Sequence, residues 1–332
     1  MKILFITPAL DPNFGGAPIS EASLAKSLGD LGQVQVLCRR KFHVPDFSKK
    51  FQLKVREFAP VDFLLAWCWP WHVLNRDVKN SNVVHINGHW RWENFFASRL
   101  CLRHQIPYVL HPRGMLLVWH RKVWLKHLFN WFIGNSIVQN ASKLIALSQF
   151  EVRHFEKYRV AKEKVFVQPN GVSWSIEAKR FFENPLPETP KYLLYIGRLE
   201  KRKNLMFLVE AFAQIANEGL GMQLVLMGPS ERGYDLEVKK RVSELGIERW
   251  VTFRAPIYGD EKWAFIQHAK AVLYPSVEEP FGRVPFEAIA AGSQPVVPDQ
   301  SGGKEYLEPF MPENIYRSAD LTSLTEVLRR VS

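Results

Sequence analysis

The chain has 332 residues, of which 47% are hydrophobic and 23% charged, a composition that fits a folded protein of two domains. Its 11 Trp and 23 Phe exclude an intrinsically disordered chain. The net charge of +11 is uneven, because residues 1–180 carry 26 Lys and Arg against 12 Asp and Glu, whereas residues 181–332 carry 18 against 21. The first half is therefore expected to face an anionic partner.

Cysteine usage and the lengths of apolar runs bear on the cellular compartment. Cys38, Cys68 and Cys101 are odd in number and lack metal-ligand spacing, which predicts reduced thiols. The apolar run within residues 1–10 is too short for a signal peptide. The run at 63–71 falls short of the roughly 20 residues that a membrane span needs. We therefore expect a cytoplasmic protein without a transmembrane helix.

Strand-like runs alternate with helical segments along the whole chain, which predicts an α/β fold with parallel sheets. A first set of runs lies at 2–7, 33–38, 82–87, 107–111, 143–147 and 164–169, and a second at 192–197, 223–228, 250–253, 271–276 and 294–298. The stretch between the two sets is polar and contains prolines, as linkers do. We therefore predict an N-terminal domain over 1–172, a linker over 173–190 and a C-terminal domain over 191–332.

A glycine pair follows the first predicted strand in the stretch "PNFGGAP", before a helix expected to begin near Ser20. Gly15 and Gly16 would let the backbone approach a diphosphate closely, although a flexible turn explains the pair equally well. The third glycine of a dinucleotide fingerprint is missing, and no acidic residue for a ribose ends the second strand. A nicotinamide cofactor is therefore disfavoured, while Arg39 and Arg40 leave a phosphorylated dinucleotide open.

Two cations follow the strand predicted at 192–197, in the stretch "GRLEKRKNL". Arg198 lies just beyond the strand and Lys203 lies where a helix begins, so both are placed to neutralise a diphosphate without a metal. A solvated basic loop is the competing interpretation, because Lys201 and Arg202 stand between them.

Two glutamates stand eight positions apart in "EEPFGRVPFEAIAAG". Glu279 belongs to a loop that follows a strand expected to end at Pro275, and Glu287 lies about one turn into a helix that ends at Gly292. Carboxylates beside a helix N-terminus suit a ligand that carries both phosphates and hydroxyls. An exposed Glu279 and a Glu287 that complements the helix dipole is the competing interpretation.

The basic first half also contains an aromatic segment, residues 115–134. It interleaves apolar and basic side chains: Trp119, Trp124, Leu128 and Trp131 with Arg121, Lys122, Lys126 and His127. An interfacial helix on anionic lipid and a core helix with a basic edge both fit this pattern. We favour contact with the inner face of the cell membrane, and no nucleic-acid recognition motif is found.

Taken in order, these motifs resemble retaining glycosyltransferases of family 4. The resemblance runs from "MKILFITP" to about "SGGKEYL" and includes "FGGAP", "HPRGML", "QPNGV", "GRLEKRKNL", "LVLMGP", "PSVEEPFGRVPFEAIAAG" and "SGGKE". It implies the GT-B fold, in which two Rossmann-like domains face each other. It also implies transfer of a sugar from a nucleotide-diphosphate donor. Together with the basic first half and the aromatic segment, it leads us to expect a lipid-linked or surface-polysaccharide glycan as the acceptor. No cofactor is expected beyond the donor, and the lack of Asp-x-Asp predicts that no metal carries the diphosphate.

The resemblance implies roles for residues of the C-terminal domain. Glu279 matches the glutamate that contacts the hydroxyls of the donor sugar, and Glu287 matches the one that holds the ribose. Arg198 and Lys203 match the cations on the diphosphate, and Ile257 the place where backbone atoms meet the nucleobase.

Backbone groups complete the implied donor site. The N–H groups around Phe281, Gly282 and Arg283 would face sugar and phosphate, with Gly15 and Gly16 opposite them. The cations and the helix N-terminus would stabilise the charge that develops on the leaving phosphate. Since no nucleophile is evident, our hypothesis is a front-face displacement in which the leaving phosphate helps to take the proton of the acceptor.

The chain departs from the family in the stretch "HPRGML". Many relatives have a His directly before this glycine, where the chain has Arg113, and His111 lies two residues earlier. His111 therefore joins Glu279, Arg198 and Lys203 as a candidate catalytic residue, since Arg is a poor proton acceptor.

Relatives usually continue for several tens of residues with a helix that returns to the N-terminal domain, whereas this chain stops at "TEVLRRVS". The alternative function is therefore a truncated, inactive GT-B protein that binds nucleotide or membrane. An NAD(P)-dependent oxidoreductase is a less favoured third interpretation. The base, sugar, acceptor and linkage are not named by the sequence.

Overall fold

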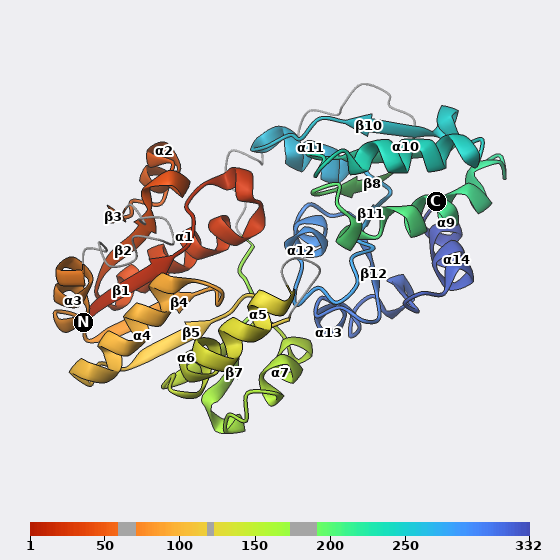
Figure 1. Cartoon of the computed structure of the whole chain (residues 1–332). Helices are drawn as coiled ribbons and strands as arrows, with labels where there is room; N and C mark the ends of the chain where they lie inside the picture. The colour runs from red at the N-terminus through yellow and green to blue at the C-terminus, as the bar shows by residue number, and fades with distance from the viewer. Residues whose placement is uncertain (59–70, 118–122, 173–190) are drawn as a thin grey trace. The chain divides into compact units, whose positions relative to one another are not determined.

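A computed structural model describes residues 1–58, 71–117, 123–172 and 191–332. These residues form two compact units, Met1–Gly171 and Val172–Ser332, each built on a parallel sheet (Figure 1). Two sheets of parallel strands flanked by helices are the architecture expected of a GT-B chain. Cys68, Trp119, Arg121, Lys122 and the predicted linker lie outside the described residues.

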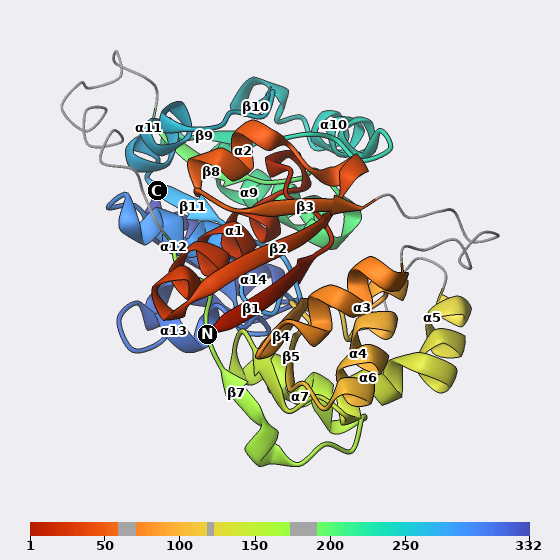
Figure 2. The ribbon, with the colours of Figure 1, turned by 90° about the vertical axis from the view of Figure 1, so that its left-hand side faces the viewer.

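The first unit holds seven parallel strands in the order β3-β2-β1-β4-β5-β6-β7, part of which can be followed in Figure 2. The strands are β1 Lys2–Thr7, β2 Gln33–Arg39, β3 Val55–Phe58, β4 Val83–Asn87, β5 Tyr108–His111, β6 Lys143–Ala146 and β7 Val165–Val167. The helices are α1 Gly16–Leu28, α2 Pro45–Lys50, α3 Trp71–Lys79, α4 Trp92–His104, α5 Val123–Phe129, α6 Asn135–Gln139 and α7 Gln149–Glu156.

The second unit holds six parallel strands in the order β10-β9-β8-β11-β12-β13. The strands are β8 Tyr192–Ile196, β9 Gln223–Met227, β10 Val251–Arg254, β11 Ala271–Leu273, β12 Gln294–Pro298 and β13 Ile315–Tyr316. The helices are α9 Leu205–Ala216, α10 Tyr234–Glu244, α11 Asp260–His268, α12 Arg283–Ala290, α13 Lys304–Leu307 and α14 Leu321–Val331.

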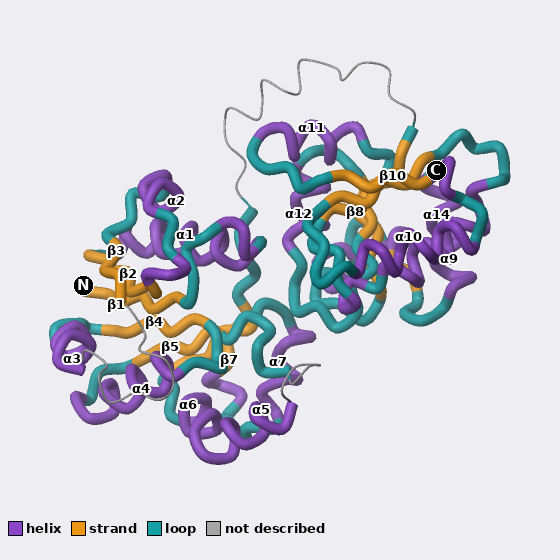
Figure 3. Tube along the Cα trace, turned by 45° about the horizontal axis from the view of Figure 1, so that its top comes forward, coloured by secondary structure: helices purple, strands orange, loops and turns teal. Residues whose placement is uncertain are grey.

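Each sheet is covered on both faces because its central strands are apolar on both faces. In β1, Leu4 and Ile6 join one core cluster and Phe5 joins another that includes Ala22 and Ala25 of α1. Alternate residues of β8 are likewise shared between a cluster with α9, α10 and α14 and a cluster with α11 and α12. Successive strand side chains point to opposite faces, so an uninterrupted apolar strand requires helices on both sides (Figure 3).

Most predicted strands are confirmed within a residue or two, and the differences have local causes. β3 and β13 were not predicted, because one is a four-residue edge strand and the other has only two residues. Helix α1 begins at Gly16 rather than near Ser20, since Gly15 takes a φ of 92° and turns the chain there. β11 ends at Leu273, two residues before Pro275. Cys38 and Cys101 are buried free thiols.

The aromatic segment is helical wherever it is described beyond residue 122. α5 continues through a π-helical stretch, Asn130–Gly134, directly into α6. Among the described residues, no helix has the length and apolar character needed to cross a membrane.

Candidate donor site

The candidate site lies in the second unit, where the strand order reverses. β8 pairs with β9 on one side and with β11 on the other. At such a reversal the connections leave in opposite directions, and the carboxyl ends of the two central strands are where ligands bind in open α/β sheets. Arg198 and Lys203 follow β8, and Glu279 follows β11, so the topology brings the predicted residues to one edge.

Lys203 and Glu279 form the central contact of this edge. The Lys203 ammonium donates to the Glu279 carboxylate at 2.8 Å and to the Tyr274 hydroxyl at 3.1 Å, and it stands 4.9 Å from the centre of the Tyr274 ring. Arg202 lies 4.0 Å from the same carboxylate. Only 7% of Lys203 is exposed, so this cation is buried beside an aromatic ring and a carboxylate and is no solvated loop residue.

Electrostatics keep Glu279 ionised in this setting. Burial by itself would raise the pKa of its carboxyl, but the charges of Lys203 and Arg202 and hydrogen bonds from Lys203 and Tyr274 outweigh burial and lower that pKa to about 2. Burial, followed by the nearby charge of Glu279, raises the pKa of Tyr274 well above its usual value. The phenol therefore stays neutral beside an ionised carboxylate at neutral pH.

The loop between the two glutamates brings backbone close to this pair. Gly282 takes a φ of 71°, and a Cβ on it would stand 2.5 Å from the ring of Tyr274, so only glycine fits. Phe281 is 3% exposed and stacks on Phe286 with ring centres 4.4 Å apart. α12 begins at Arg283, and its N-cap residue, Gly282, has no side chain that could cap the first N–H groups. The N-terminus of a helix suits an anionic ligand, because its N–H groups point outward and the helix dipole is positive there.

Glu287 lies one turn into α12, as predicted, and it is almost fully buried. Its carboxylate accepts from the Lys262 ammonium at 2.6 Å and lies 3.5 Å from the Arg283 guanidinium. If Glu287 only complemented the helix dipole, its contact with Lys262 of the neighbouring helix α11 would have no explanation.

The other predicted residues of this unit lie further from the central pair. Arg198 is half exposed, with its guanidinium 3.3 Å from the Glu200 carboxylate, so a ligand phosphate can still reach it. Ile257 follows β10, is partly buried and packs against the core cluster that contains α11.

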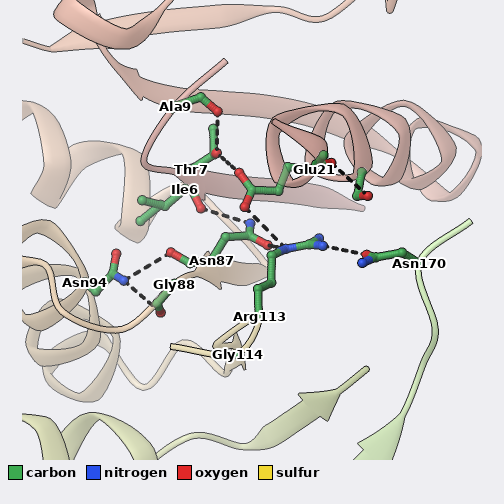
Figure 4. Close-up of polar contacts among 12 residues, drawn as sticks. Ile6, Thr7, Ala9, Glu21, Asn87, Gly88, Asn94, Arg113, Gly114 and Asn170 are labelled. Carbon is green, nitrogen blue, oxygen red and sulfur yellow. Dashed lines mark hydrogen bonds and ion pairs between the residues drawn. The ribbon is translucent and has the colours of Figure 1, made fainter. Parts of the chain in front are cut away.

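In the first unit, a buried polar cluster fills the carboxyl ends of β1, β4 and β5 (Figure 4). Arg113, in the left-handed region at φ 54°, donates to the Oδ1 atoms of Asn87 at 3.0 Å and Asn170 at 2.7 Å. Its guanidinium also lies 3.4 Å from the Glu21 carboxylate, which accepts from the Thr7 hydroxyl. Burial raises the pKa of Glu21 by more than the Arg113 charge lowers it.

This cluster changes the interpretation of Arg113. A guanidinium that contacts α1, β4 and the segment after β7 is occupied within its own unit, so we regard Arg113 as a residue that positions these segments. Glu21 lies five residues into the helix that Gly15 and Gly16 open, and its contact with Arg113 ties that helix to the sheet.

His111 lies at the end of β5, fully buried, and its two ring nitrogens have no hydrogen-bond partner among the described residues. Burial, with smaller contributions from the charges of Arg113 and His85, lowers the pKa of His111 well below its usual value. A neutral imidazole is therefore held at the carboxyl edge of the first sheet. His89, by contrast, makes a 2.9 Å hydrogen bond with Asn130, as expected of a structural histidine.

The basic end of the second strand does not favour a phosphorylated dinucleotide. Arg39 Nε donates to Glu93 at 2.7 Å, and Arg40 Nε donates to Glu57 at 3.2 Å. Both cations are thus paired within the chain, which removes the feature that had left this cofactor open.

Comparison with known proteins gives two family matches. The model described as "Glycosyltransferase Family 4" matches residues 14–174, and that described as "Glycosyl transferases group 1" matches residues 177–331. The chain belongs to the glycosyltransferases of family 4. The predicted family and GT-B fold class are therefore confirmed.

Individual relatives of this glycosyltransferase are distant. It is 29% identical over 175 residues to D-inositol 3-phosphate glycosyltransferase of Arthrobacter sp. (strain FB24), covering 50% of this chain and 41% of that protein. It is 29% identical over 199 residues to lipopolysaccharide 1,2-N-acetylglucosaminetransferase of Salmonella typhimurium, covering 54% of this chain and 50% of that protein. The aligned stretches thus span half or less of these relatives.

A solved structure shares the fold over almost the whole chain. The Anabaena protein HepE, in complex with UDP-glucose, superposes with a TM-score of 0.76 at 20% identity, covering 99% of this chain and 89% of that one. At this identity the likeness supports the GT-B fold of this glycosyltransferase.

Sequence reasoning missed three residues that contact predicted residues of the two sheet edges. Tyr274 contacts Lys203 and Glu279, Lys262 contacts Glu287, and Glu21 contacts Arg113. Tyr274 gave a signal, since it directly follows β11, but Lys262 and Glu21 are ordinary helical residues in the sequence. Their partners are 25 and 92 positions away, respectively, and no local pattern links such residues.

The lowered pKa of Glu279 predicts a pH dependence of stability. Because this pKa is about 2 in the folded chain and near 4.5 when unfolded, its contribution to the free energy of unfolding is fully present above about pH 4.5 and is lost as pH falls toward 2. Urea unfolding at a series of pH values should show a smaller acid-induced loss for E279Q than for the wild type. E313Q, which changes an exposed carboxylate, should follow the wild type. If the free energy of unfolding fell by the same amount with decreasing pH in E279Q and in the wild type, the lowered pKa of Glu279 would be contradicted.

Proposed function

We propose that this protein transfers a sugar from a nucleotide-diphosphate donor, with retention of anomeric configuration, to a lipid-linked or surface-polysaccharide glycan. The observation that carries the proposal is the largely buried contact between Lys203 and Glu279 at the carboxyl edge of the second sheet. A largely buried ion pair contributes little net stability, so a pair beside a glycine loop and the N-terminus of α12 is better explained by a ligand.

The proposed donor contacts follow from the chemistry of each group. Lys203 and Arg198 would neutralise the diphosphate, and the Glu279 carboxylate would accept from hydroxyls of the sugar. Glu287 would accept from the ribose, and backbone atoms at Ile257 would meet the base.

Backbone donors would complete the site. The N–H groups at Phe281, Gly282 and Arg283 lie at the start of α12, where an anion gains from the helix dipole. We retain Gly15 and Gly16 as further backbone contacts to the donor, since a glycine at φ 92° opens α1 and leaves its first backbone groups without a covering side chain.

The proposed reaction is a front-face displacement. The anomeric C–O bond to the phosphate breaks and its electron pair goes to the phosphate oxygen, while the acceptor oxygen forms the new bond on the same face. The acceptor proton passes to the leaving phosphate oxygen. Lys203 and Arg198 would stabilise the charge on that phosphate, which requires no metal. The neutral His111 imidazole would accept a hydrogen bond from the acceptor side.

Support for a membrane-linked acceptor comes from the surface of the aromatic segment. Four large apolar side chains of α5 and its π-helical extension are well exposed: Trp124 68%, Leu128 44%, Trp131 73% and Phe132 65%. Lys126 and His127 add basic groups to the same stretch. Aromatic and basic side chains together are typical of helices that lie at an anionic membrane surface. We therefore propose that this segment binds the inner face of the cell membrane.

Nucleotide titration tests the donor site. Calorimetric titration of UDP, GDP and ADP should show that one diphosphate binds the wild type and that R198A/K203A does not bind it measurably. K201A is the matched control, because Lys201 belongs to the same loop but is exposed and paired with Glu237. Binding lost equally in K201A, or no binding of any diphosphate to the wild type, would contradict the proposal.

Product analysis separates the enzyme from the alternative of an inactive binding protein. With the donor whose base is found by titration, we expect turnover and a product with the anomeric configuration of the donor. An inverted linkage would rule out the front-face displacement, and binding without turnover on any glycan acceptor would favour the inactive protein.

Vesicle binding tests the proposed membrane surface. W131S/F132S should bind vesicles of phosphatidylglycerol and phosphatidylcholine about tenfold more weakly than the wild type, since two exposed aromatic side chains no longer enter the interface. F310S removes an aromatic side chain that is 81% exposed in the second unit and should leave vesicle binding unchanged. Equal binding of W131S/F132S and the wild type in co-sedimentation would refute the membrane proposal.

A further inference from the structure

We propose that Lys262 is a positioning residue for the recognition of the nucleotide ribose, acting through Glu287. This inference rests on the proposed function, in which Glu287 accepts hydrogen bonds from the ribose. It adds a residue to that site, and it assigns to Lys262 a role in telling a ribonucleotide from a deoxyribonucleotide.

The geometry around Glu287 carries the inference. Lys262 lies on α11 and Glu287 on α12, and the ammonium nitrogen stands 2.6 Å from Oε2 of the carboxylate. Arg283 stands 3.5 Å from the other oxygen, Oε1, from one helical turn earlier. Each carboxylate oxygen thus has its own cation, and the plane of the carboxylate is defined by contacts at both ends.

The burial of Glu287 explains why a cation beside its carboxylate matters. The side chain of Glu287 is 4% exposed and that of Lys262 is 21% exposed. The carboxylate is therefore almost completely shielded from water, whereas the Lys262 side chain is partly accessible to it. A nearby cation offsets the cost of placing a carboxylate away from water, and a carboxylate is a strong acceptor for hydroxyl groups. Each oxygen can accept two hydrogen bonds, so the contact with Lys262 leaves room for a ligand hydroxyl.

The orientation of the carboxylate matters more for a ribose than for a phosphate. Two adjacent hydroxyls can both donate to one carboxylate only if its plane faces them, whereas charge attraction to a diphosphate depends weakly on angle. Without Lys262 the Glu287 side chain keeps Arg283 on one oxygen and can turn about its last bond. We therefore expect loss of Lys262 to weaken ribose recognition selectively.

The competing explanation for the Lys262–Glu287 contact is that it only stabilises the packing of α11 against α12. In that case, loss of Lys262 would lower the free energy of unfolding, but it would not change the relative affinity for two nucleotides that differ in one hydroxyl. The ratio of those two affinities therefore separates the two roles.

The experiment is a calorimetric titration of a nucleoside diphosphate and its 2′-deoxy form, for example UDP and 2′-deoxy-UDP. The base is the one that the titration of UDP, GDP and ADP identifies. The wild type should prefer the ribonucleotide about tenfold, the effect of one hydrogen bond to a charged group. K262M and E287Q should both lose most of this preference, and K262R should keep most of it. K239M is the matched control, because Lys239 contacts Asp235 at 3.0 Å on α10, and its preference should equal that of the wild type.

The outcomes distinguish this inference from the proposed function. If E287Q loses the preference and K262M keeps it, Lys262 is only structural and the inference is overturned, while the role of Glu287 stands. If E287Q keeps the preference, the ribose role of Glu287 fails and this inference fails with it. If K262M does not fold, K262Q takes its place, and an unchanged preference there overturns the inference.

Discussion

The contact between the Lys203 ammonium and the Glu279 carboxylate, 2.8 Å apart, joins side chains that are only 9% and 17% exposed, and it is the constraint on which the candidate site depends. Removing an ion from water costs several kcal/mol unless a partner is present, and here each side chain is the partner of the other. Tyr274, the glycine at 282 and the start of α12 all lie around this contact. A ligand with a phosphate and hydroxyls can exchange with each partner, so the ion pair also prepares the site to bind.

Contacts between a carboxylate and a cation also occur near other strand ends of the described chain. Glu287 is held by Lys262 and Arg283 in the second unit, and Glu21 is held by Arg113 in the first. In each case a buried carboxylate meets at least one cation from another element near the carboxyl edge of a parallel sheet. This edge is where loops and helix starts converge in α/β folds, so charges placed there are organised by the fold itself.

Much of this architecture could be predicted from the sequence. Strands such as β1 and β8 are short apolar runs with clear boundaries, and the helix that carries Glu287 has its proline and glycine signals in the printed sequence. What could not be predicted is pairing at a distance. The environment of Arg113 depends on residues from three other segments, and the two-residue edge strand β13 is defined by its pairing with β12. Contacts of this kind follow from tertiary packing, which local periodicity does not encode.

The central claim is that a sugar nucleotide binds by taking over the contacts that Lys203 and Glu279 make with each other. A crystal structure of the protein with an intact sugar nucleotide tests it most directly. The account predicts a phosphate oxygen within hydrogen-bond distance of Lys203 Nζ and a sugar hydroxyl donating to the Glu279 carboxylate. A nucleotide bound elsewhere, or bound with both side chains contacting only each other, would contradict it.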